Sequence, residues 1–572
     1  MSASPSRSRV ERLAPWVTGL LLAAPVLLAY YPPMTDVPNH EASVGLLRHF
    51  GDEALLPAGL YQLNLGEPNQ LFHMVAWALS LLVSTRWAIK LVVAAAVIAI
   101  PVAEGRFARH LGASPLVALA VAPVALGWLF AWGLIANLVG LAALLAMLPV
   151  LDRFSERPTA RGAFACAGAV VLLYFAHEAM LVLFGGTALA LALLRPFSRK
   201  DTSLRLGPFV ASVSVVVAQL GWQRRYVTAS VGSIPLIWGS LADKLRQLPW
   251  TLLPQTDPVV LAAVAALSAL VLASMVRLRR QERMQEPARA SHSASLDDAR
   301  ARALAHRWAL LGAACVAAYF VSPETLNGAT LIYHRWLPPG FALLAAVCAP
   351  RDLWTEPGRV ARVALAALPV ATLLATAPSF ADSDRQHRAL AQVIEQIEPA
   401  SAVATVDLGP ADPTRRYSLG AAGGRILATR GGRLAAGLAD STIAPVVIPA
   451  RYQWREPSVR MLFDPWSFLP AADFRRFRYL LVHASDADLA WVAVASLDPE
   501  ARYTATSGEW MLFESRLPVV PLVSEDVPVV AGSTDTLRAR LMRLLPAQLA
   551  RRGQDDPEPP WPEPMAPSGH GP

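Results

Sequence analysis

Long runs of apolar residues, chiefly Ala, Leu and Val, recur along the chain and are separated by short polar connections. A run of about 15–20 such residues is long enough to cross the hydrocarbon core of a bilayer as a helix. About eleven runs approach or meet this length and predict transmembrane helices: Leu13–Tyr31, Trp87–Val102, Pro115–Phe130, Leu134–Val150, Gly162–Phe175, Met180–Leu194, Pro208–Trp222, Val259–Val276, Trp308–Val321, Leu331–Cys348 and Val363–Thr376. The pattern therefore predicts an α-helical polytopic membrane protein.

The hydrophobic pattern changes after Ala377, where the long apolar runs end. His387–Ile397 has helical periodicity, and three short apolar stretches are typical of strands. These stretches are Ala402–Val406, Tyr479–Val482 and Glu509–Phe513. The sequence thus predicts a transmembrane domain over residues 1–377 and a small α/β domain over residues 378–520.

Residues 521–572 have a third character. Thr534–Arg552 carries leucines at helical spacing with arginines between them, which predicts a basic amphipathic helix lying on a membrane or on the preceding domain. The last stretch, Gly553–Pro572, is rich in proline and is predicted to be disordered.

The charge of the chain changes this picture in one respect, because it orients the helices. Only 16% of the residues are charged, whereas about 25% are charged in a soluble domain. The net charge of +8 would suit a nucleic-acid ligand, but the arginines lie in short connections between apolar runs. Basic residues in such loops mark the cytoplasmic side of a membrane protein. We therefore predict membrane lipids, and no nucleic acid, as partners.

The same arginines decide where the shorter apolar stretch Leu71–Val83 lies. The N-terminus is predicted to be inside because of Arg7, Arg9 and Arg12. If Leu71–Val83 does not cross the membrane, the later basic loops also lie inside, and the outside turns at residues 131–133, 176–179 and 322–330 contain no Lys or Arg. If it does cross, every later loop is inverted. Leu71–Val83 is therefore predicted to be a juxtamembrane helix on the outer surface.

This topology predicts a multi-pass protein of the inner (cytoplasmic) membrane. Its N-terminus is inside and its C-terminus is outside. The outer face then holds the first extracytoplasmic loop (residues 32–86) with its juxtamembrane helices, a loop over residues 223–256, and the C-terminal domain.

Candidate catalytic residues lie at the start of the first outer loop. Asp36 precedes a predicted helix, Val37–Phe50, and is either its N-cap or a catalytic carboxylate held at a rigid helix start. His40 lies one helical turn after Asp36, so the two side chains share a face, although a partly buried structural histidine is the alternative. Glu41 turns toward another face and is either a further catalytic residue or a solvated one.

Candidate substrate-binding residues lie at other outer edges of the apolar runs. His73 lies on the juxtamembrane helix, where an interfacial residue at headgroup level is the alternative. His177 and Glu178 interrupt an apolar run. A charge in mid-bilayer costs about 2.5–3.5 kcal/mol on insertion scales. Glu178 is therefore predicted to lie at a turn or in a wet cavity, and a plain turn remains the alternative.

A third outer edge carries Glu324, His334 and Arg335. An arginine at an outer edge runs against the usual orientation bias, which suggests an anionic partner such as a lipid phosphate. Snorkelling of the side chain to headgroups is the alternative. Asp36, His40 and Glu178 are also suitable donors for a divalent metal, but sequence gives no distance between them, so the cofactor stays open.

Two short motifs and their order carry a resemblance to a known family. Asp36-x-Pro38-x-His40 and Glu67-Pro68-Asn69 lie in the first outer loop, and the second span leads into the basic cytoplasmic segment Arg106–Gly112. This arrangement resembles the GT-C superfamily of integral-membrane glycosyltransferases, in particular bacterial protein mannosyltransferases and lipid A aminoarabinose transferases. The chain lacks the lysine usual in the second motif.

The resemblance implies an outer-face active site and an inverting transfer of a sugar from a polyprenyl-phosphate donor to an extracytoplasmic glycan, lipid or protein acceptor. It implies that Asp36 is the base that deprotonates an acceptor hydroxyl and that Arg335 holds the charge of the leaving phosphate. Two other hypotheses stay open: a non-catalytic membrane assembly protein on the GT-C scaffold, and a lipid or glycan transporter. Few mid-span charges are present, which counts against transport.

Overall fold

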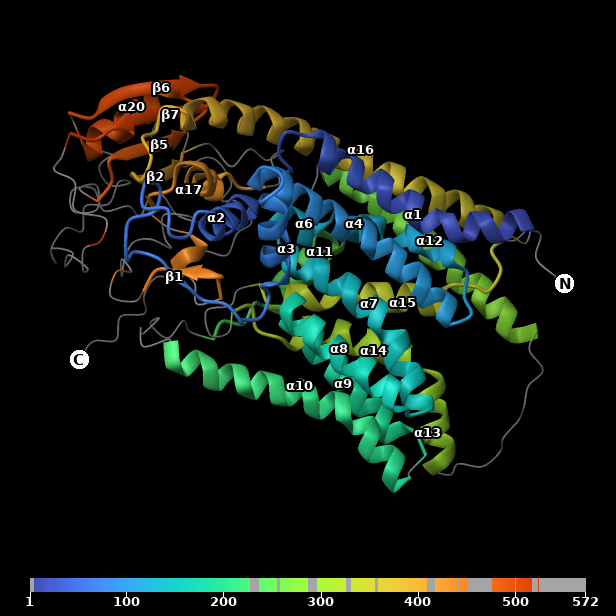
Figure 1. The fold of residues 1–572 in the computed structure, drawn as a ribbon. Coiled ribbons are helices and arrows are strands. Elements are labelled where there is room, and N and C mark those ends of the chain that lie inside the picture. Colours follow the sequence, from blue (N-terminus) through green and yellow to red (C-terminus); the bar gives the residue numbers. More distant parts are fainter. Residues whose placement is uncertain are drawn as a thin grey trace, which may run out of the picture.

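The structure of the protein is a computed structural model. It describes residues 5–196, 198–226, 236–254, 258–285, 296–325, 331–354, 358–408, 417–435, 437–440, 443–449, 452, 476–498, 500–516 and 523. The predicted amphipathic helix and Pro-rich end lie outside these residues. A helix bundle forms one part of the molecule, and a small sheet with its own helices forms the other (Figure 1).

The bundle agrees with the predicted spans. Its helices are α1 (Pro5–Leu28), α4 (Thr85–His110), α7 (Ile135–Glu156), α8 (Ala160–Ala176), α9 (Glu178–Leu194), α10 (Arg199–Tyr226), α12 (Pro258–Gln285), α14 (Arg307–Val321), α15 (Leu337–Cys348) and α16 (Arg359–Ile394). In the described part of the chain, 7 helical segments are long and apolar enough to cross a membrane, and shorter apolar helices accompany them. Phe164, Val259 and Leu374 are strongly exposed on these helices, as expected of side chains that face lipid.

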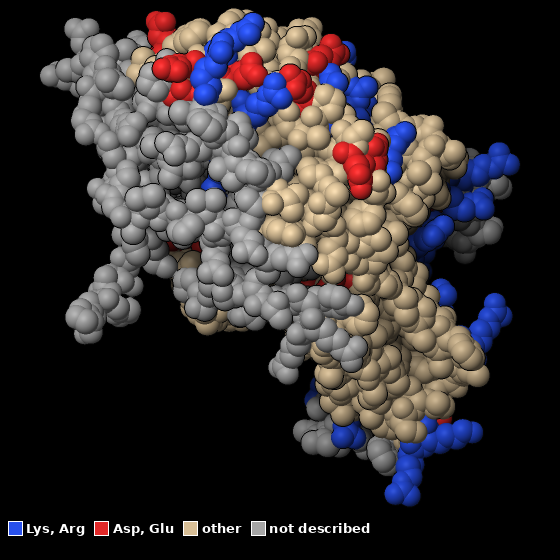
Figure 2. All heavy atoms as spheres, turned by 60° about the vertical axis from the view of Figure 1, so that its left-hand side comes forward, with Lys and Arg blue, Asp and Glu red and all other residues tan. Residues whose placement is uncertain are grey.

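Charged groups are distributed as a membrane requires. On the face shown in Figure 2, a broad uncharged band separates mixed acidic and basic groups near the sheet from basic groups at the far ends of the helices. The structure thereby confirms the predicted polytopic helical fold.

Two predicted spans differ from the structure. The predicted span Pro115–Phe130 is broken into a 3-10 helix, Pro115–Val121, and two short helices, α5 (Ala122–Ala125) and α6 (Trp128–Trp132). Pro123, inside this segment, supplies no N–H for a continuous helix. The last span does not stop near Ala377, because α16 continues without interruption into the C-terminal domain (Figure 1).

Two further helices lie between predicted spans. The predicted outer loop over residues 223–256 contains α11 (Leu241–Leu252), and α13 (Leu296–Ala305) lies between the predicted spans Val259–Val276 and Trp308–Val321. Leucines at positions 241, 245, 248 and 252 follow a helical period, so the signal for α11 was present in the sequence.

The C-terminal domain is a five-stranded mixed sheet with the order β3-β2-β5-β7-β6. The three predicted strands are β2 (Ala402–Asp407), β5 (Tyr479–His483) and β7 (Trp510–Glu514). The prediction missed β3 (Arg433–Leu434), which has two residues, and β6 (Arg502–Ser507), a polar edge strand. Strands β3, β2 and β5 are parallel, whereas β5, β7 and β6 are antiparallel.

Helices cover both faces of this sheet. Ala490, Ala493 and Val494 of α20 (Ala487–Leu497) pack in one core with residues of β2 and β5. On the other face, the end of α16 and α17 (Gly424–Arg430) pack in a core shared with α2 (Val37–Arg48). The first outer loop is thus part of the same body as the C-terminal domain.

A short strand pair strengthens this connection. The loop strand β1 (Gln62–Leu63) pairs antiparallel with β4 (Val446–Val447) of the C-terminal part. The Gln70 side-chain amide donates to the carbonyls of Asn64 and Ile443, at 2.7 and 3.1 Å. Residues 32–86 and the C-terminal domain therefore lie on the same side of the helix bundle.

Candidate active site

Asp36 lies at the N-cap position, directly before α2, but its side chain does not cap the helix. The side chain makes no hydrogen bond to the helix N-terminus. One carboxylate oxygen accepts a hydrogen bond of 2.8 Å from Asn39 Nδ2, and the other lies 3.4 Å from His40 Nε2. The N-cap interpretation is therefore wrong as an account of this side chain, whose oxygens face Asn39 and His40.

The turn between α6 and α7 fixes the backbone at Asp36. The amides of Thr35 and Asp36 donate to the carbonyls of Ala131 and Trp132, at 2.9 and 3.1 Å. Gly133 follows with φ of 80°, and a Cβ there would lie 2.7 Å from the Asp36 nitrogen. The turn can close on Asp36 because a glycine has neither a Cβ nor a penalty at positive φ.

His40 connects Asp36 to His73 on α3 (Leu71–Ser80). The His40 Nδ1 atom lies 3.2 Å from His73 Nε2, and both side chains are buried. If Asp36 is ionised, His40 carries its proton on Nε2 and accepts a hydrogen bond from His73 Nε2. His73 Nδ1 is then an acceptor. It has no partner among the described residues, and neither does Asn39 Oδ1. We call Asp36, Asn39, His40 and His73 the Asp36 cluster.

Burial shifts the proton affinities in this cluster. It raises the pKa of the Asp36 carboxyl, against the opposing effects of His40 and Asn39. It lowers the pKa of His40, and it lowers that of His73 well below the ordinary value. The cluster therefore combines a carboxylate of increased basicity with two neutral imidazoles, which suits a general base.

We expect the protein to lose stability as the pH falls below about 6.5, the ordinary pKa of histidine. The pKa values of His40 and His73 are depressed in the folded state, so the unfolded chain binds more protons and the stability that these groups contribute above 6.5 is lost on acidification. The loss approaches about 1.4 kcal/mol per histidine per pH unit while the folded imidazole stays neutral. The raised pKa of Asp36 acts in the opposite sense, because its contribution is present below 3.8 and is lost as the pH rises through the folded pKa.

Thermal unfolding of wild type and His73→Gln between about pH 5 and pH 8 measures this effect, since His73 is uncharged when folded. The variant should show a shallower dependence on pH than wild type. Equal pH dependences would contradict a neutral, buried His73.

Glu41 lies outside the Asp36 cluster. Its side chain is 2% exposed, so the solvated alternative is wrong. The carboxylate accepts hydrogen bonds of 3.0 Å from Tyr31 Oη and from Thr85 Oγ1, and it lies 3.9 Å from Arg425 Nε. These contacts indicate a structural link between the loop, α4 and the C-terminal domain. The predicted catalytic role of Glu41 stays a prediction.

His177 and Arg335 form a second cluster. His177 Nδ1 accepts a hydrogen bond of 3.1 Å from the Ala179 amide and so begins α9, while its Nε2 lies 3.5 Å from Arg335 Nη1. The amide of Glu178 donates to Asn69 Oδ1 at 3.1 Å. Asn69, which belongs to the Glu67-Pro68-Asn69 motif, adopts a φ of 65°. The motif therefore contacts the turn that the sequence predicted at residues 176–179.

Glu324 and His334 lie against α11. His334 stacks on Trp128, with ring centroids 4.4 Å apart, and its Nε2 lies 2.7 Å from Gln247 Oε1. Glu324 is half-buried beside Lys244, whose ammonium group donates to two backbone carbonyls. Burial and Asp243 raise the pKa of Glu324, and Lys244 opposes them. Lys244 and Gln247 were missed because α11 was predicted as loop.

Short elements join these groups into one polar region. Trp128 of helix α6 stacks on His334. The carbonyl of Trp132, the last residue of α6, accepts a hydrogen bond from the Asp36 amide. Asn69 and His73 come from one segment and contact the second cluster and the Asp36 cluster respectively. Among the described residues, no group of three or more His, Cys, Asp or Glu side chains could hold a metal ion.

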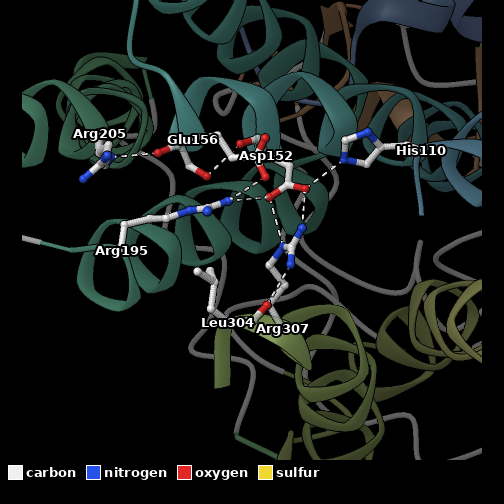
Figure 3. A network of polar contacts seen from close by, with 8 residues as sticks. His110, Asp152, Glu156, Arg195, Arg205, Leu304 and Arg307 are labelled. Carbon is white, nitrogen blue, oxygen red and sulfur yellow. Dashed lines mark hydrogen bonds and ion pairs between the residues drawn. The ribbon is translucent and has the colours of Figure 1, made fainter. Parts of the chain in front are cut away.

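A further network, missed by sequence analysis, lies at the other end of α7. Asp152 is fully buried and accepts hydrogen bonds from Arg307 at 2.6 and 3.0 Å (Figure 3). His110 Nε2 lies 2.8 Å from the same carboxylate, and Arg195 lies 3.5 Å from it. The network joins the ends of α4, α7, α9 and α14.

The fold is that of an integral-membrane protein with the architecture predicted from the sequence. No protein-family model and no curated protein sequence matches the chain. The solved structure of ArnT from Cupriavidus metallidurans bound to undecaprenyl phosphate is similar, with a TM-score of 0.51 and 12% identity over 89% of this chain and 98% of ArnT. Its apo structure gives the same values. ArnT is a lipid A aminoarabinose transferase of the GT-C type, so the likeness confirms the predicted fold.

Proposed function

We propose that this protein is a membrane glycosyltransferase that moves a sugar from a polyprenyl-phosphate donor to an extracytoplasmic acceptor. The observation that carries the proposal is the Asp36 cluster, in which a partly exposed carboxylate of raised pKa lies beside two buried imidazoles in a GT-C-like fold. The ArnT structure contains undecaprenyl phosphate, which supports a donor of this class here.

Asp36 acts as the general base in this proposal. The acceptor hydroxyl gives its proton to Asp36 as its oxygen attacks the anomeric carbon, and the bond from that carbon to the lipid phosphate breaks on the opposite face. Asn39 and His40 hold the two carboxylate oxygens in place. The transfer therefore inverts the anomeric configuration.

The second cluster provides the positive charge that the leaving phosphate needs. Arg335 is a cation two residues before α15, beside the His177 ring and in electrostatic contact with Glu178, and fixed cations stabilise charge that develops in a transition state. His73, His177 and His334 line the same polar region and serve as substrate-binding residues. Glu178 and Glu324 accept hydrogen bonds from sugar hydroxyls in this proposal.

The orientation of the chain supports an extracytoplasmic site. The first loop and the C-terminal domain pair through β1 and β4, so both lie on one side of the bundle. Basic loops and the N-terminal arginines belong to the other side. The C-terminal domain is therefore extracytoplasmic in this proposal.

Lipid and glycan profiling of cells that lack the protein tests the proposed function. Deletion should remove one glycoconjugate and cause its polyprenyl-linked sugar donor to accumulate, and wild type should restore both. Unchanged glycoconjugates, or a loss without donor accumulation, would contradict the transferase assignment.

We expect Arg335→Gln to weaken the binding of undecaprenyl phosphate by roughly 10–100-fold, because a hydrogen bond to a charged group contributes about 1.5–3 kcal/mol. Arg246→Gln is the matched control, since Arg246 is 67% exposed and pairs with Asp243. Binding in detergent micelles gives the measurement, and undecaprenol, which lacks the phosphate, should bind both variants alike. Equal affinity of Arg335→Gln and wild type for the phosphate would remove Arg335 from the donor site.

A further inference from the structure

The C-terminal domain packs backbone against backbone on the helix that follows Asp36. A Cβ at Gly424 of α17 would lie 2.2 Å from the Pro38 carbonyl oxygen, and a Cβ at Gly45 of α2 would lie 2.6 Å from Ala428 Cα. The two helices can approach this closely because each contributes a glycine to the crossing. Movement of α17 is therefore transmitted directly to α2.

The C-terminal domain also forms a hydrogen bond to Thr35, the residue before Asp36. The Ser418 amide donates to Thr35 Oγ1 at 3.0 Å. On the other side, the Ala131 and Trp132 carbonyls hold the amides of Thr35 and Asp36. Asp36 is thus fixed between a turn of the helix bundle and a segment of the C-terminal domain.

Arg425 is the charged group at this junction, and its side chain is 6% exposed. Its Nη1 donates to the His387 carbonyl of α16 at 2.7 Å, and its Nη2 donates to Tyr30 Oη at 3.3 Å. Its guanidinium also lies 5.0 Å from the Tyr31 ring centroid. Arg425 therefore contacts the exit of the first span, the extension of the last span and, through Glu41, the helix α2.

Arg425 contacts α2 through an ion pair with Glu41. Its carboxylate is buried, receives neutral donors from Tyr31 and Thr85, and has Arg425 as its cation at 3.9 Å. Without Arg425 that charge would be buried without compensation, and such groups reposition themselves or lose their charge. Because Glu41 directly follows His40 on α2, its displacement also displaces the Asp36 cluster.

We infer that Arg425 is a positioning residue of the active site, acting through Glu41 to hold α2, and with it Asp36 and His40, in the geometry needed for transfer. The C-terminal domain is then part of the catalytic apparatus, not a separate binding module. The effect on kcat rests on the proposed function, whereas the effect on the hydrogen–deuterium exchange of α2 does not.

The kinetic test compares Arg425→Ala with Arg430→Ala in the full-length protein. Arg430 is the matched control because it lies on the same helix and donates to the Ile394 and Glu395 carbonyls, away from α2. A displacement of about 1 Å can cost about 100-fold in rate, so Arg425→Ala should lower kcat by about 10–100-fold with an unchanged KM for the donor. Equal kcat values in the two variants would overturn the inference.

A double-substitution cycle shows whether Arg425 acts through Glu41. Glu41→Gln and Arg425→Ala should each lower kcat, and the double variant should lower it no further than the larger single effect. Fully additive losses would mean that Arg425 acts by another route and would overturn the inference.

A smaller change keeps the inference testable if Arg425→Ala does not fold. Thr35→Val removes the bond from Ser418, and Thr35→Ser keeps it. We expect kcat to fall several-fold in Thr35→Val and to stay near wild type in Thr35→Ser. Equal activity of both variants would count against positioning by the C-terminal domain.

Hydrogen–deuterium exchange separates the inference from the proposed function. Peptides covering residues 35–48 should exchange faster in Arg425→Ala than in wild type or Arg430→Ala. Faster exchange in a protein whose wild type transfers no sugar would retain the positioning role and reject the transferase. Unchanged exchange beside an active wild type would reject the positioning role alone.

Discussion

Replacing Asp36 with asparagine is expected to lower sugar transfer by about 10²–10⁴-fold, the usual contribution of a general base. Asparagine has nearly the shape of aspartate and can still accept the hydrogen bond from Asn39. Its amide can donate to His40 Nε2 if the His40 and His73 tautomers reverse, so the chain of contacts survives. The expected loss is therefore in the proton transfer and not in the fold.

The dependence on pH identifies Asp36 as the base. Burial raises the pKa of its carboxyl above 3.8, and the ionised form is the active one. The kcat/KM of wild type should therefore fall on acidification at a higher pH than an exposed aspartate would give. The residual activity of Asp36→Asn should not show this fall of kcat/KM on acidification.

Asp52→Asn is the matched control for this experiment. Asp52 lies in the same outer loop, but its side chain is 47% exposed and pairs only loosely with His49 at 3.9 Å. Transfer assays with equal amounts of folded protein should show wild-type rates for Asp52→Asn. A fully active Asp36→Asn would remove the base assignment and would mean that another group accepts the proton of the acceptor hydroxyl.

The transmembrane part of this fold could be predicted because bilayer thickness sets the length of each apolar run. Charge in the loops then decided that Leu71–Val83 lies on the surface, and the structure has the short helix α3 there. The broken segment at Pro123 carried its own signal, since proline interrupts helical hydrogen bonding.

The site was predictable only within one helical turn. The spacing of Asp36 and His40 predicted a shared face, and the structure brings their side chains to 3.4 Å. The contact of His40 with His73 joins residues 33 positions apart, and no local pattern fixes it. Arg425 lies 384 positions after Glu41 in a stretch of glycine and alanine, so its buried ion pair depends on docking of the domain.

The Asp152 network shows the same limit at the other end of α7. His110 belongs to the basic segment Arg106–Gly112, which the sequence analysis predicted to lie in a loop on the cytoplasmic side. In the structure His110 and Arg307 instead converge on one carboxylate that has no exposure to solvent (Figure 3). A charged residue at the end of a span can therefore be an interior residue when neighbouring helices supply its partners.

Asp152→Ala is expected to destabilise the folded protein by about 3–5 kcal/mol, because removing one partner of a buried ion pair leaves the other charges uncompensated. Arg307 and His110 would both lose their acceptor, and the ends of α4, α7 and α14 would lose their common contact. Glu156→Ala provides the matched control. Glu156 lies one turn further along α7, is 49% exposed and pairs with Arg195, so its loss should cost at most about 1 kcal/mol.

Unfolding of both variants by denaturant in mixed micelles measures the difference. The folded fraction of Asp152→Ala should retain wild-type kcat, because Asp152 lies at the end of α7 remote from the Gly133 turn that holds Asp36. Equal, small destabilisation of the two variants would show that Arg307 and His110 find other partners and that the network is replaceable. A large and selective loss for Asp152→Ala would identify this carboxylate as the interior charge on which the inner ends of the helices are assembled.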